Sequence, residues 1–449
     1  MSENGNEFSR RNFIKLSSLT AATLAVGAGA AATSGNVQAA MVGTTGKANL
    51  PKAKGPRLVV VGGGTSGLTI AKYAKKANPK LDVVLVEKRD MYSSCFASNL
   101  LYSGVISLEF LADHSFLDAA VNNKYTFFNA TCTGLDRAAK RLHTSEGEID
   151  YDFLVVAPGV SYDYSRIGVK DPEVEFALRQ NYPGGFISPT EHITIRQKVQ
   201  GFEGGTFVIT VPGGNYRCLP GPYERACMVA AAFKKNKVKG KVLVLDHNPN
   251  FTIKGAGFGA AYKELYGDYI EYKPSMEIKS VDVEKRLIKT EFDTIKFDDA
   301  TIYPGVRGST LLQALGLMDP KSPQKEALID DHKYNFVGDD HVYVTGDSRP
   351  MGFSKSANTA NTEGKYVAKL VAARSQGKDI DWVSPETICY SMVNADPNEA
   401  ISVSARYVYD NAKKAFGFSP DTSMDEKRDT AKGNRLMEWN KGMYRDLFA

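Results

Sequence analysis

Short apolar runs recur along the chain, and segments with helical spacing of apolar residues follow several of them. The helical patterns cover residues 69–77, 228–235 and 355–373. Apolar runs of this length are typical of strands that are buried on both faces of a parallel sheet. The predicted strands are residues 58–61, 82–86, 151–159, 205–211, 241–245 and 341–350. Strands that alternate with helices predict an α/β fold.

A glycine-rich turn follows the first predicted strand. Gly62, Gly64 and Gly67 have G-x-G-x-x-G spacing, and a second strand then leads to Glu87. The first glycine allows a tight turn, the second lets the backbone approach a pyrophosphate, and the third permits close packing of helix on strand. A carboxylate at Glu87 can accept both hydroxyls of a ribose. The pattern predicts a Rossmann-type dinucleotide site and disfavours a glycine-rich turn without function.

Later segments favour FAD as the dinucleotide. The strands at 151–159 and 341–350 end in small-residue turns, and the second turn contains Gly346 and Asp347. In flavoproteins with two dinucleotide-binding domains, such segments return to the first domain, and the aspartate meets the ribityl and pyrophosphate region of FAD. The helix that begins near Ser356 would direct its N-terminal dipole at the flavin. A turn or capping residue is the alternative role for Asp347.

The second half of the chain repeats the strand–helix–strand pattern without a nucleotide signature. The loop after the strand at 205–211 contains Pro212, Pro220 and Pro222. Proline has no backbone N–H group, whereas a phosphate-binding loop needs free N–H groups to hold the phosphate. We therefore expect no NAD(P)H site in this half. The loop presents Cys218 instead, and we expect Pro220 and Pro222 to stiffen it.

These patterns predict an α/β protein with two Rossmann-like domains of the FAD/NAD(P)-binding type and a C-terminal α+β interface domain. The expected FAD-binding domain comprises residues 56–160 and a return segment, 286–380. The degenerate NAD-like domain comprises residues 161–285, and the C-terminal domain comprises residues 381–449. In the last of these, the charged residues 425–435 are expected to be linker-like.

The first forty residues have the features of an export signal. The motif SRRNFIK at residues 9–15 is a twin-arginine signature, and a V-Q-A cleavage pattern follows at 37–39. We predict a twin-arginine signal peptide over residues 1–39 and a periplasmic mature chain. An N-terminal membrane anchor is the alternative, which the weakly apolar residues 16–34 disfavour. No integral membrane segment is expected in the mature chain.

Composition narrows the function classes further. Of the 449 residues, 43% are hydrophobic and 24% are charged, which is ordinary for a globular protein. The net charge of +5 is too diffuse to indicate a nucleic-acid partner. No metal site is predicted. The five cysteines would lie in a compartment where a disulfide can persist.

Three cysteines lie in contexts that carry a family resemblance. SSCFASN surrounds Cys95, YRCLPGPYERA surrounds Cys218, and ETICYSMV surrounds Cys389. With the FAD fingerprint, these motifs resemble the flavoprotein subunit of flavocytochrome c sulfide dehydrogenase, a disulfide-reductase-like flavoprotein related to sulfide:quinone oxidoreductases. The resemblance runs from about residue 56 to the C-terminus. It implies that Cys95 is joined to the flavin 8α-methyl group and that Cys218 and Cys389 form a redox-active disulfide.

Alternative roles stay open for the cysteines. Cys132 and Cys227 have no special context and are predicted to be buried small hydrophobic residues. A bridge between Cys218 and Cys227 is also compatible with the sequence. Cys95 could be a packed thiol beside noncovalently held FAD. The sequence does not decide which catalytic cysteine carries a persulfide.

The expected activity is oxidation of sulfide to zero-valent sulfur or polysulfide. HS⁻ can attack a disulfide by thiol–disulfide exchange, which gives a persulfide and a thiolate. Glu224 and Arg225 could tune that thiolate or steer an anion, but a surface salt bridge is the expected role of each. Trp439 could cover the flavin, form a partner surface or pack in the core.

The electron acceptor is expected to be another molecule. The chain has no C-x-x-C-H motif, so no haem is expected in it. The resemblance implies a separate c-type cytochrome subunit as the acceptor. Quinone as the acceptor is one alternative. A flavoprotein without turnover that maintains a sulfur-carrier protein is the other.

Overall fold

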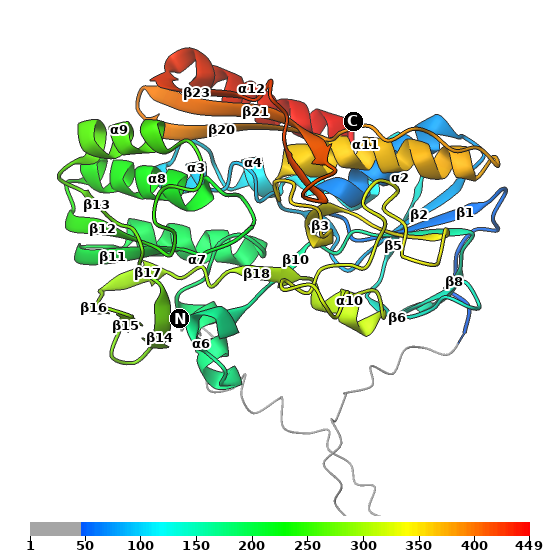
Figure 1. Ribbon diagram of the computed structural model, residues 1–449, viewed down its shortest axis with the longest axis horizontal. Helices are drawn as coiled ribbons and strands as arrows, with labels where there is room; N and C mark the ends of the chain where they lie inside the picture. The colour runs from blue at the N-terminus through cyan, green and yellow to red at the C-terminus, as the bar shows by residue number, and fades with distance from the viewer. Residues whose placement is uncertain (1–45) are drawn as a thin grey trace, which may run out of the picture. The chain divides into compact units, whose positions relative to one another are not determined.

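The computed structural model describes residues 46–449 (Figure 1). The predicted signal peptide, residues 1–39, lies outside the described residues. Within residues 46–449, none of the helices combines the length and the apolarity needed to cross a membrane.

A five-stranded parallel sheet forms the first half of the fold. Its centre is β1 (Arg57–Val61), which pairs with β2 (Asp82–Glu87) on one side and β9 (Phe153–Val156) on the other. The sheet is completed by β5 (Thr126–Asn129) and β19 (Val342–Val344), in the order β19-β9-β1-β2-β5. The valines and leucines of β1 and β2 are buried, as expected for strands covered on both faces. The predicted return of the late strand to the first sheet is confirmed.

Two helices from distant parts of the chain cover one face of this sheet (Figure 1). Helix α2 (Thr65–Ala77) follows β1 directly and packs against α11 (Ala357–Arg374). The N-cap of α11 is Ser356, whose Oγ accepts a hydrogen bond from the backbone N–H of Thr359 at 3.3 Å. The helix predicted to begin near Ser356 is therefore confirmed.

A second parallel sheet forms the other Rossmann-like half. Its strands are β11 (Gly204–Val211), β12 (Lys239–Asp246), β13 (Ile270–Lys273) and β17 (Asp299–Thr301), in the order β13-β12-β11-β17. The helices that connect its consecutive strands are α8 (Gly221–Asn236) and α9 (Gly255–Tyr266).

The second half extends further along the chain than its expected end at residue 285. That position lies within the hairpin of β14 (Ile278–Asp282) and β15 (Leu287–Thr290), which pairs further with β16 (Thr294–Lys296). After this hairpin, β17 still pairs with β11. The structure therefore places the boundary after Thr301, because the edge strand of the second sheet comes last.

The C-terminal part is an antiparallel sheet with one long helix. Its elements are β20 (Glu386–Ala395), β21 (Asn398–Asp410), β22 (Ala415–Phe418), β23 (Ser423–Asp429) and α12 (Thr430–Phe448). The sheet contacts α8 and α9 of the second half and α11 of the first (Figure 1). The expectation of a linker at residues 425–435 was wrong. These charged residues form β23 and the start of α12 instead.

Shorter elements connect these parts. Two antiparallel ribbons are formed by β3 (Met91–Tyr92) with β4 (His114–Ser115) and by β10 (Val160–Tyr162) with β18 (Val306–Gly308). A three-stranded sheet is formed by β6 (Cys132–Asp136), β7 (Arg141–Thr144) and β8 (Gly147–Asp150). The remaining helices are α3 (Leu100–Ser103), α4 (Glu109–Ala112), α5 (Phe116–Asn123), α6 (Pro172–Asn181), α7 (Pro189–Gln200), α10 (Thr310–Ala314) and the 3₁₀ turns η1 (Tyr164–Ile167) and η2 (Gly346–Ser348).

Two apolar clusters form the core. One surrounds the first parallel sheet and includes side chains of α11 and α12. The other surrounds the second parallel sheet and includes side chains of β20 and β21. The predicted α/β class, with two Rossmann-like halves and a C-terminal antiparallel sheet, is confirmed.

Candidate functional site

The turn between β1 and α2 has the geometry predicted for its glycines. Gly62 has φ +102°, a conformation that favours glycine. A Cβ atom on Gly67 would overlap the carbonyl oxygen of Gly62, so glycine is needed for α2 to begin this close to β1. A Cβ atom on Gly64 would meet no protein atom within 4 Å. The turn is therefore open at Gly64, where a pyrophosphate is predicted to approach.

A carboxylate stands beside this turn at the end of β2. Glu87 is 7% exposed, and its Oε2 accepts a hydrogen bond from the Gly63 N–H at 2.7 Å. Burial opposes ionisation, but Arg89, whose Nε lies 2.8 Å from Oε1, and the Gly63 N–H hold the pKa of Glu87 below its usual value. No side chain caps the N-terminus of α2 in the described structure. Its first N–H groups are thus left for an anion.

The Gly-Asp turn after β19 reaches the same helix N-terminus. The hydroxyl of Thr345 lies 2.9 Å from that of Ser66 in the first turn of α2. Asp347 is 8% exposed, and its Oδ2 lies 3.2 Å from Nε of Arg217. The structure therefore brings Asp347 to the predicted dinucleotide site. Its partner Arg217, on the Cys218 loop, was not predicted from the sequence.

The three cysteines singled out from the sequence line one pocket. The pocket encloses about 830 Å³, part of it open to solvent. Its walls include Cys95, Cys218 and Cys389, with Ser356 at the N-terminus of α11 and Trp439 on α12. All five cysteines are thiols in the structure, so the predicted bridge between Cys218 and Cys389 stays a prediction. Cys218 and Cys389 line the same pocket, which is compatible with such a bridge.

The backbone holds Cys218 in an unusual conformation. Its φ of +61° is uncommon for a residue with a side chain and is typical of functional positions. Its N–H donates to the carbonyl oxygen of Lys355 at 2.9 Å. A Cβ atom on Gly221 would lie 2.9 Å from Cys218 Sγ and 2.6 Å from the Phe186 ring, so glycine is required there.

The two prolines that follow Cys218 lie at the start of a helix. Pro220 is the N-cap residue of α8, and Pro222 lies in its first turn. Proline fits these positions because the first N–H groups of a helix have no partner within the helix. The prolines therefore start a helix two residues after the cysteine, and the expected stiffening of the loop stays a prediction.

Glu224 and Arg225 do not form the surface salt bridges that were expected. Arg225 is 1% exposed and donates to the carbonyl oxygens of Gly184 at 2.6 Å and Gly185 at 3.0 Å. Glu224 lines the pocket and accepts hydrogen bonds from Asn99 Nδ2 at 2.8 Å and the Met392 N–H at 2.8 Å. Burial raises the pKa of Glu224. The expectation failed because α8 is enclosed by α3 and β20, which the sequence does not show.

The environments of Cys218 and Cys389 differ. Burial, together with the neighbouring groups Cys389, Cys95 and Glu224, raises the pKa of Cys218 well above its usual value. Cys389 lies next to Lys254, whose Nζ is 3.6 Å from the cysteine Sγ. Sequence reasoning missed Lys254, since it lies 135 residues away along the chain.

The other two cysteines are buried outside the pocket. Cys132 on β6 is 8% exposed, and Cys227 on α8 is fully buried. Both prefer the neutral thiol, because burial raises their pKa values. Their predicted role as small buried residues is confirmed. Cys227 is not among the pocket residues, which disfavours the alternative bridge from Cys218.

In the second parallel sheet, protein side chains occupy the position where a ribose would bind. Asp246 ends β12 as Glu87 ends β2, but it is 0% exposed. Its Oδ2 accepts hydrogen bonds from the hydroxyls of Tyr223 at 2.6 Å and Tyr272 at 2.9 Å. The aromatic side chains thus take the hydrogen bonds that a ribose would make. This supports the expectation that this half holds no nicotinamide nucleotide.

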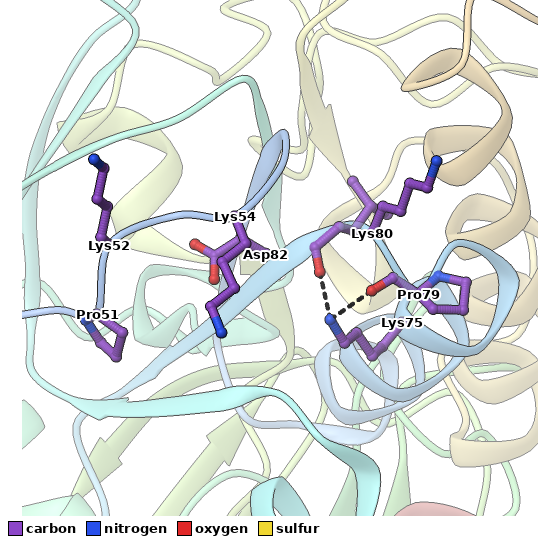
Figure 2. Close-up of a pocket in the computed structure, with 8 residues that line it drawn as sticks. Pro51, Lys52, Lys54, Lys75, Pro79, Lys80 and Asp82 are labelled. Atoms are coloured by element: carbon purple, nitrogen blue, oxygen red, sulfur yellow. Dashed lines mark hydrogen bonds between the residues drawn. The ribbon is translucent and has the colours of Figure 1, made fainter.

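A second recess lies at the opposite end of the first sheet (Figure 2). It encloses about 680 Å³ and is lined by Lys52, Lys54, Lys75, Lys80 and neighbouring residues, including Asp82 at the start of β2. The ammonium of Lys75 donates hydrogen bonds to the carbonyl oxygen of Pro79 at 2.9 Å, which Figure 2 shows, and to that of Leu81 at 2.7 Å. The recess contains none of the predicted site residues, so the cysteine pocket is the candidate site.

Family comparisons agree with the cysteine contexts. Residues 193–304 match the family described as sulfide dehydrogenase [flavocytochrome c] flavoprotein chain, central. Residues 384–448 match the flavocytochrome c sulphide dehydrogenase flavin-binding family, and residues 56–180 match pyridine nucleotide-disulphide oxidoreductase. The resemblance to the flavocytochrome c sulfide dehydrogenase flavoproteins is confirmed. Glu224 and Cys218 lie in the part of the chain that matches the central region of these flavoproteins, and Cys389 lies in the part that matches their flavin-binding region.

Individual proteins are similar to this flavoprotein at low sequence identity. The type II NADH:quinone oxidoreductase of Staphylococcus haemolyticus is 24% identical over 364 residues, which is 74% of this chain and 87% of that protein. The mitochondrial sulfide:quinone oxidoreductase of Dictyostelium discoideum is 21% identical over 389 residues, 80% of this chain and 81% of that protein. The structure of sulfide:quinone oxidoreductase from Aquifex aeolicus has a TM-score of 0.69 at 16% identity and covers 87% of this chain and 91% of that one.

The residues of this flavoprotein fit FAD. The matches are to flavin-binding and FAD-type oxidoreductase families, and the opening at Gly64 can admit a pyrophosphate between α2 and Glu87. Asp347 pairs with the pocket residue Arg217, and the first residues of α11 line the same pocket, where they would face the flavin ring of a bound FAD. Trp439 lines that space and is held by a hydrogen bond from its Nε1 to Asn358 Oδ1 at 3.1 Å. Trp439 also packs against the core cluster of the first half, so its position fits both core packing and covering of the flavin.

Proposed function

We propose that the chain is a sulfide dehydrogenase flavoprotein that oxidises sulfide to zero-valent sulfur or polysulfide. In this proposal a disulfide between Cys218 and Cys389 accepts the sulfide, and a c-type cytochrome takes the electrons. The observation that carries the proposal is the single pocket lined by Cys95, Cys218 and Cys389. The matches to two regions of sulfide dehydrogenase flavoproteins support it.

The residues of the pocket support the first chemical step. HS⁻ attacks one sulfur of the bridge, the S–S bond breaks, and its electron pair leaves with the other sulfur as a thiolate. The hydrogen of HS⁻ stays on the new persulfide. Arg217 lies in the pocket wall and contributes positive charge, which favours the entry of an anion. FAD, when bound, supplies the two-electron acceptor beside the cysteine pair.

Covalent attachment of FAD through Cys95 is part of the proposal. Cys95 lines the pocket in the segment between β3 and α3, next to Tyr92 and Phe96. After precipitation with acid, we expect the wild-type pellet to stay yellow, because a thioether survives denaturation. Cys95→Ser is expected to release its flavin into the supernatant. A colourless wild-type pellet would show that FAD is held noncovalently.

The acceptor and the location complete the proposal. The family matches support a c-type cytochrome partner, since the matched family is described as flavocytochrome c. Periplasmic location rests on the motif SRRNFIK at residues 9–15. Curated relatives are described as quinone oxidoreductases, so quinone is the competing acceptor.

One assay tests the acceptor directly. We expect purified protein to reduce soluble c-type cytochrome in the presence of sulfide, with two cytochrome molecules reduced for each sulfide oxidised. Short-chain quinones are expected to be reduced much more slowly under the same conditions. Faster reduction of quinone would overturn the cytochrome proposal, and bleaching of the flavin by sulfide with neither acceptor reduced would favour a maintenance role.

A further inference from the structure

Among the residues that the structure describes, three lysines are buried, and one of them has no carboxylate partner. Lys355 pairs with Glu326 at 2.7 Å, and Lys432 pairs with Asp425 at 2.8 Å. Lys254 is 1% exposed, and no carboxylate oxygen of the described residues lies within 4.0 Å of its Nζ. A buried ammonium without an anion is costly, because its solvation is lost without compensation.

The ammonium of Lys254 is directed at Cys389. Lys254 is the N-cap residue of α9, with φ +53°. Its Nζ donates to Ser391 Oγ at 2.7 Å, to the carbonyl oxygen of Cys389 at 3.2 Å and to Cys389 Sγ at 3.6 Å. An ammonium has three N–H donors, and these three acceptors all belong to Cys389 and Ser391 of β20. The anion that this arrangement lacks would be supplied by a thiolate at Cys389.

The other charged groups around the pocket make the two cysteines unequal. Glu224 lies near Cys218, where its charge opposes a thiolate. Arg217 is paired with Asp347, and Lys355 is paired with Glu326. Lys254 lies behind the pocket lining, where its ammonium contacts the lining residues Cys389 and Ser391 and makes no hydrogen bond to Cys218.

We propose that Lys254 is a further catalytic residue, which stabilises the Cys389 thiolate released when HS⁻ attacks the Cys218 sulfur of the bridge. The inference rests on the proposed function. In the step, a bond forms between the sulfide sulfur and Cys218 Sγ, and the S–S bond breaks. Its electron pair goes to Cys389 Sγ, and no proton moves. The products are a persulfide on Cys218 and a thiolate on Cys389 that pairs with Lys254.

The placement of charge decides which sulfur is attacked. In thiol–disulfide exchange, the sulfur that forms the more stable thiolate leaves faster. Lys254 contacts Cys389 Sγ directly at 3.6 Å, whereas at Cys218 its weaker attraction is outweighed by the repulsion from Glu224. Attack on the Cys389 sulfur would instead release a thiolate on Cys218, which lies near Glu224. The structure therefore assigns the persulfide to Cys218.

The charge on Cys389 can be tested without sulfide. In the flavin-loaded protein with both thiols reduced, the rate of alkylation of Cys389 by iodoacetamide is followed against pH by peptide mass spectrometry. Lys254→Met is expected to slow this reaction about tenfold at pH 7, because the thiolate is the reactive form of a cysteine and it would lose the ammonium beside it. Lys254→Arg is expected to restore most of the rate. Lys263→Met, on the exposed face of the same helix, is the matched control and should match wild type.

The position of the persulfide is tested on the wild-type protein. Holoprotein with the bridge oxidised is mixed with one equivalent of sulfide, trapped with iodoacetamide and digested, and the persulfide is expected on Cys218. A persulfide on Cys389, or an alkylation profile unchanged by Lys254→Met in a folded protein, would overturn this inference and leave the proposed function intact. No persulfide at either cysteine, together with no cytochrome reduction, would overturn both.

Discussion

Cys389→Ser is expected to lower sulfide-dependent reduction of cytochrome c by on the order of a thousandfold or more, the scale seen when one member of a catalytic unit is removed. A serine hydroxyl cannot form the bridge, so Cys218 would be left as a thiol that sulfide does not attack. The flavin content should stay at the wild-type level, because Cys95 and the Gly62–Gly67 turn are unchanged. Initial rates with a soluble c-type cytochrome measure the effect.

Two further variants control this experiment. Cys218→Ser should cause a loss of the same order, since either substitution removes the bridge. Cys132→Ser changes a buried cysteine on β6 outside the pocket and should keep the wild-type rate. Wild-type turnover in a fully flavinylated Cys389→Ser protein would show that sulfide is oxidised without the cysteine pair.

Gly67→Ala is expected to yield protein that lacks FAD and unfolds at a lower temperature. The new methyl group would overlap the carbonyl oxygen of Gly62, and neither backbone can move away without displacing α2 from β1. Overpacking of this kind costs about 1–3 kcal/mol in free energy of unfolding. Flavin absorbance and the Tm of the apoprotein measure the two effects.

Gly64→Ala provides the matched control for that variant. Its methyl group would meet no protein atom within 4 Å, so the apoprotein should unfold at the wild-type temperature. FAD binding should still be lost, because the methyl group occupies the space in which the pyrophosphate is predicted to lie. Full FAD occupancy in both variants would contradict the placement of the dinucleotide at this turn.

The features that the sequence predicted well depend on short-range patterns. The Gly62–Gly67 turn, the carboxylate at Glu87 and the start of α11 at Ser356 each follow from spacing within one strand and one helix. The return of Asp347 to the first sheet required family resemblance, because strand order in a parallel sheet is set by packing. β19 lies next to β9 although 185 residues lie between the last residue of β9 and the first residue of β19.

The features that could not be predicted from the sequence depend on contacts between segments that are distant in the chain. Lys254 and Cys389 meet because α9 packs against the C-terminal sheet, and Arg217 meets Asp347 because the two halves face each other across the pocket. Residues 425–435 looked like a linker because they are highly charged. In the structure, β23 is a largely exposed strand, so charged residues can occupy it without being buried.

The pocket takes its walls from all three parts of the fold, which has a consequence for stability. Cys95 and Ser356 belong to the first half, Cys218 to the second and Cys389 to the C-terminal sheet. A molecule bound there contacts all three parts and holds them together. We therefore expect the flavin-loaded protein to melt in one cooperative transition. Apoprotein that lacks this brace should come apart in stages, at lower temperature.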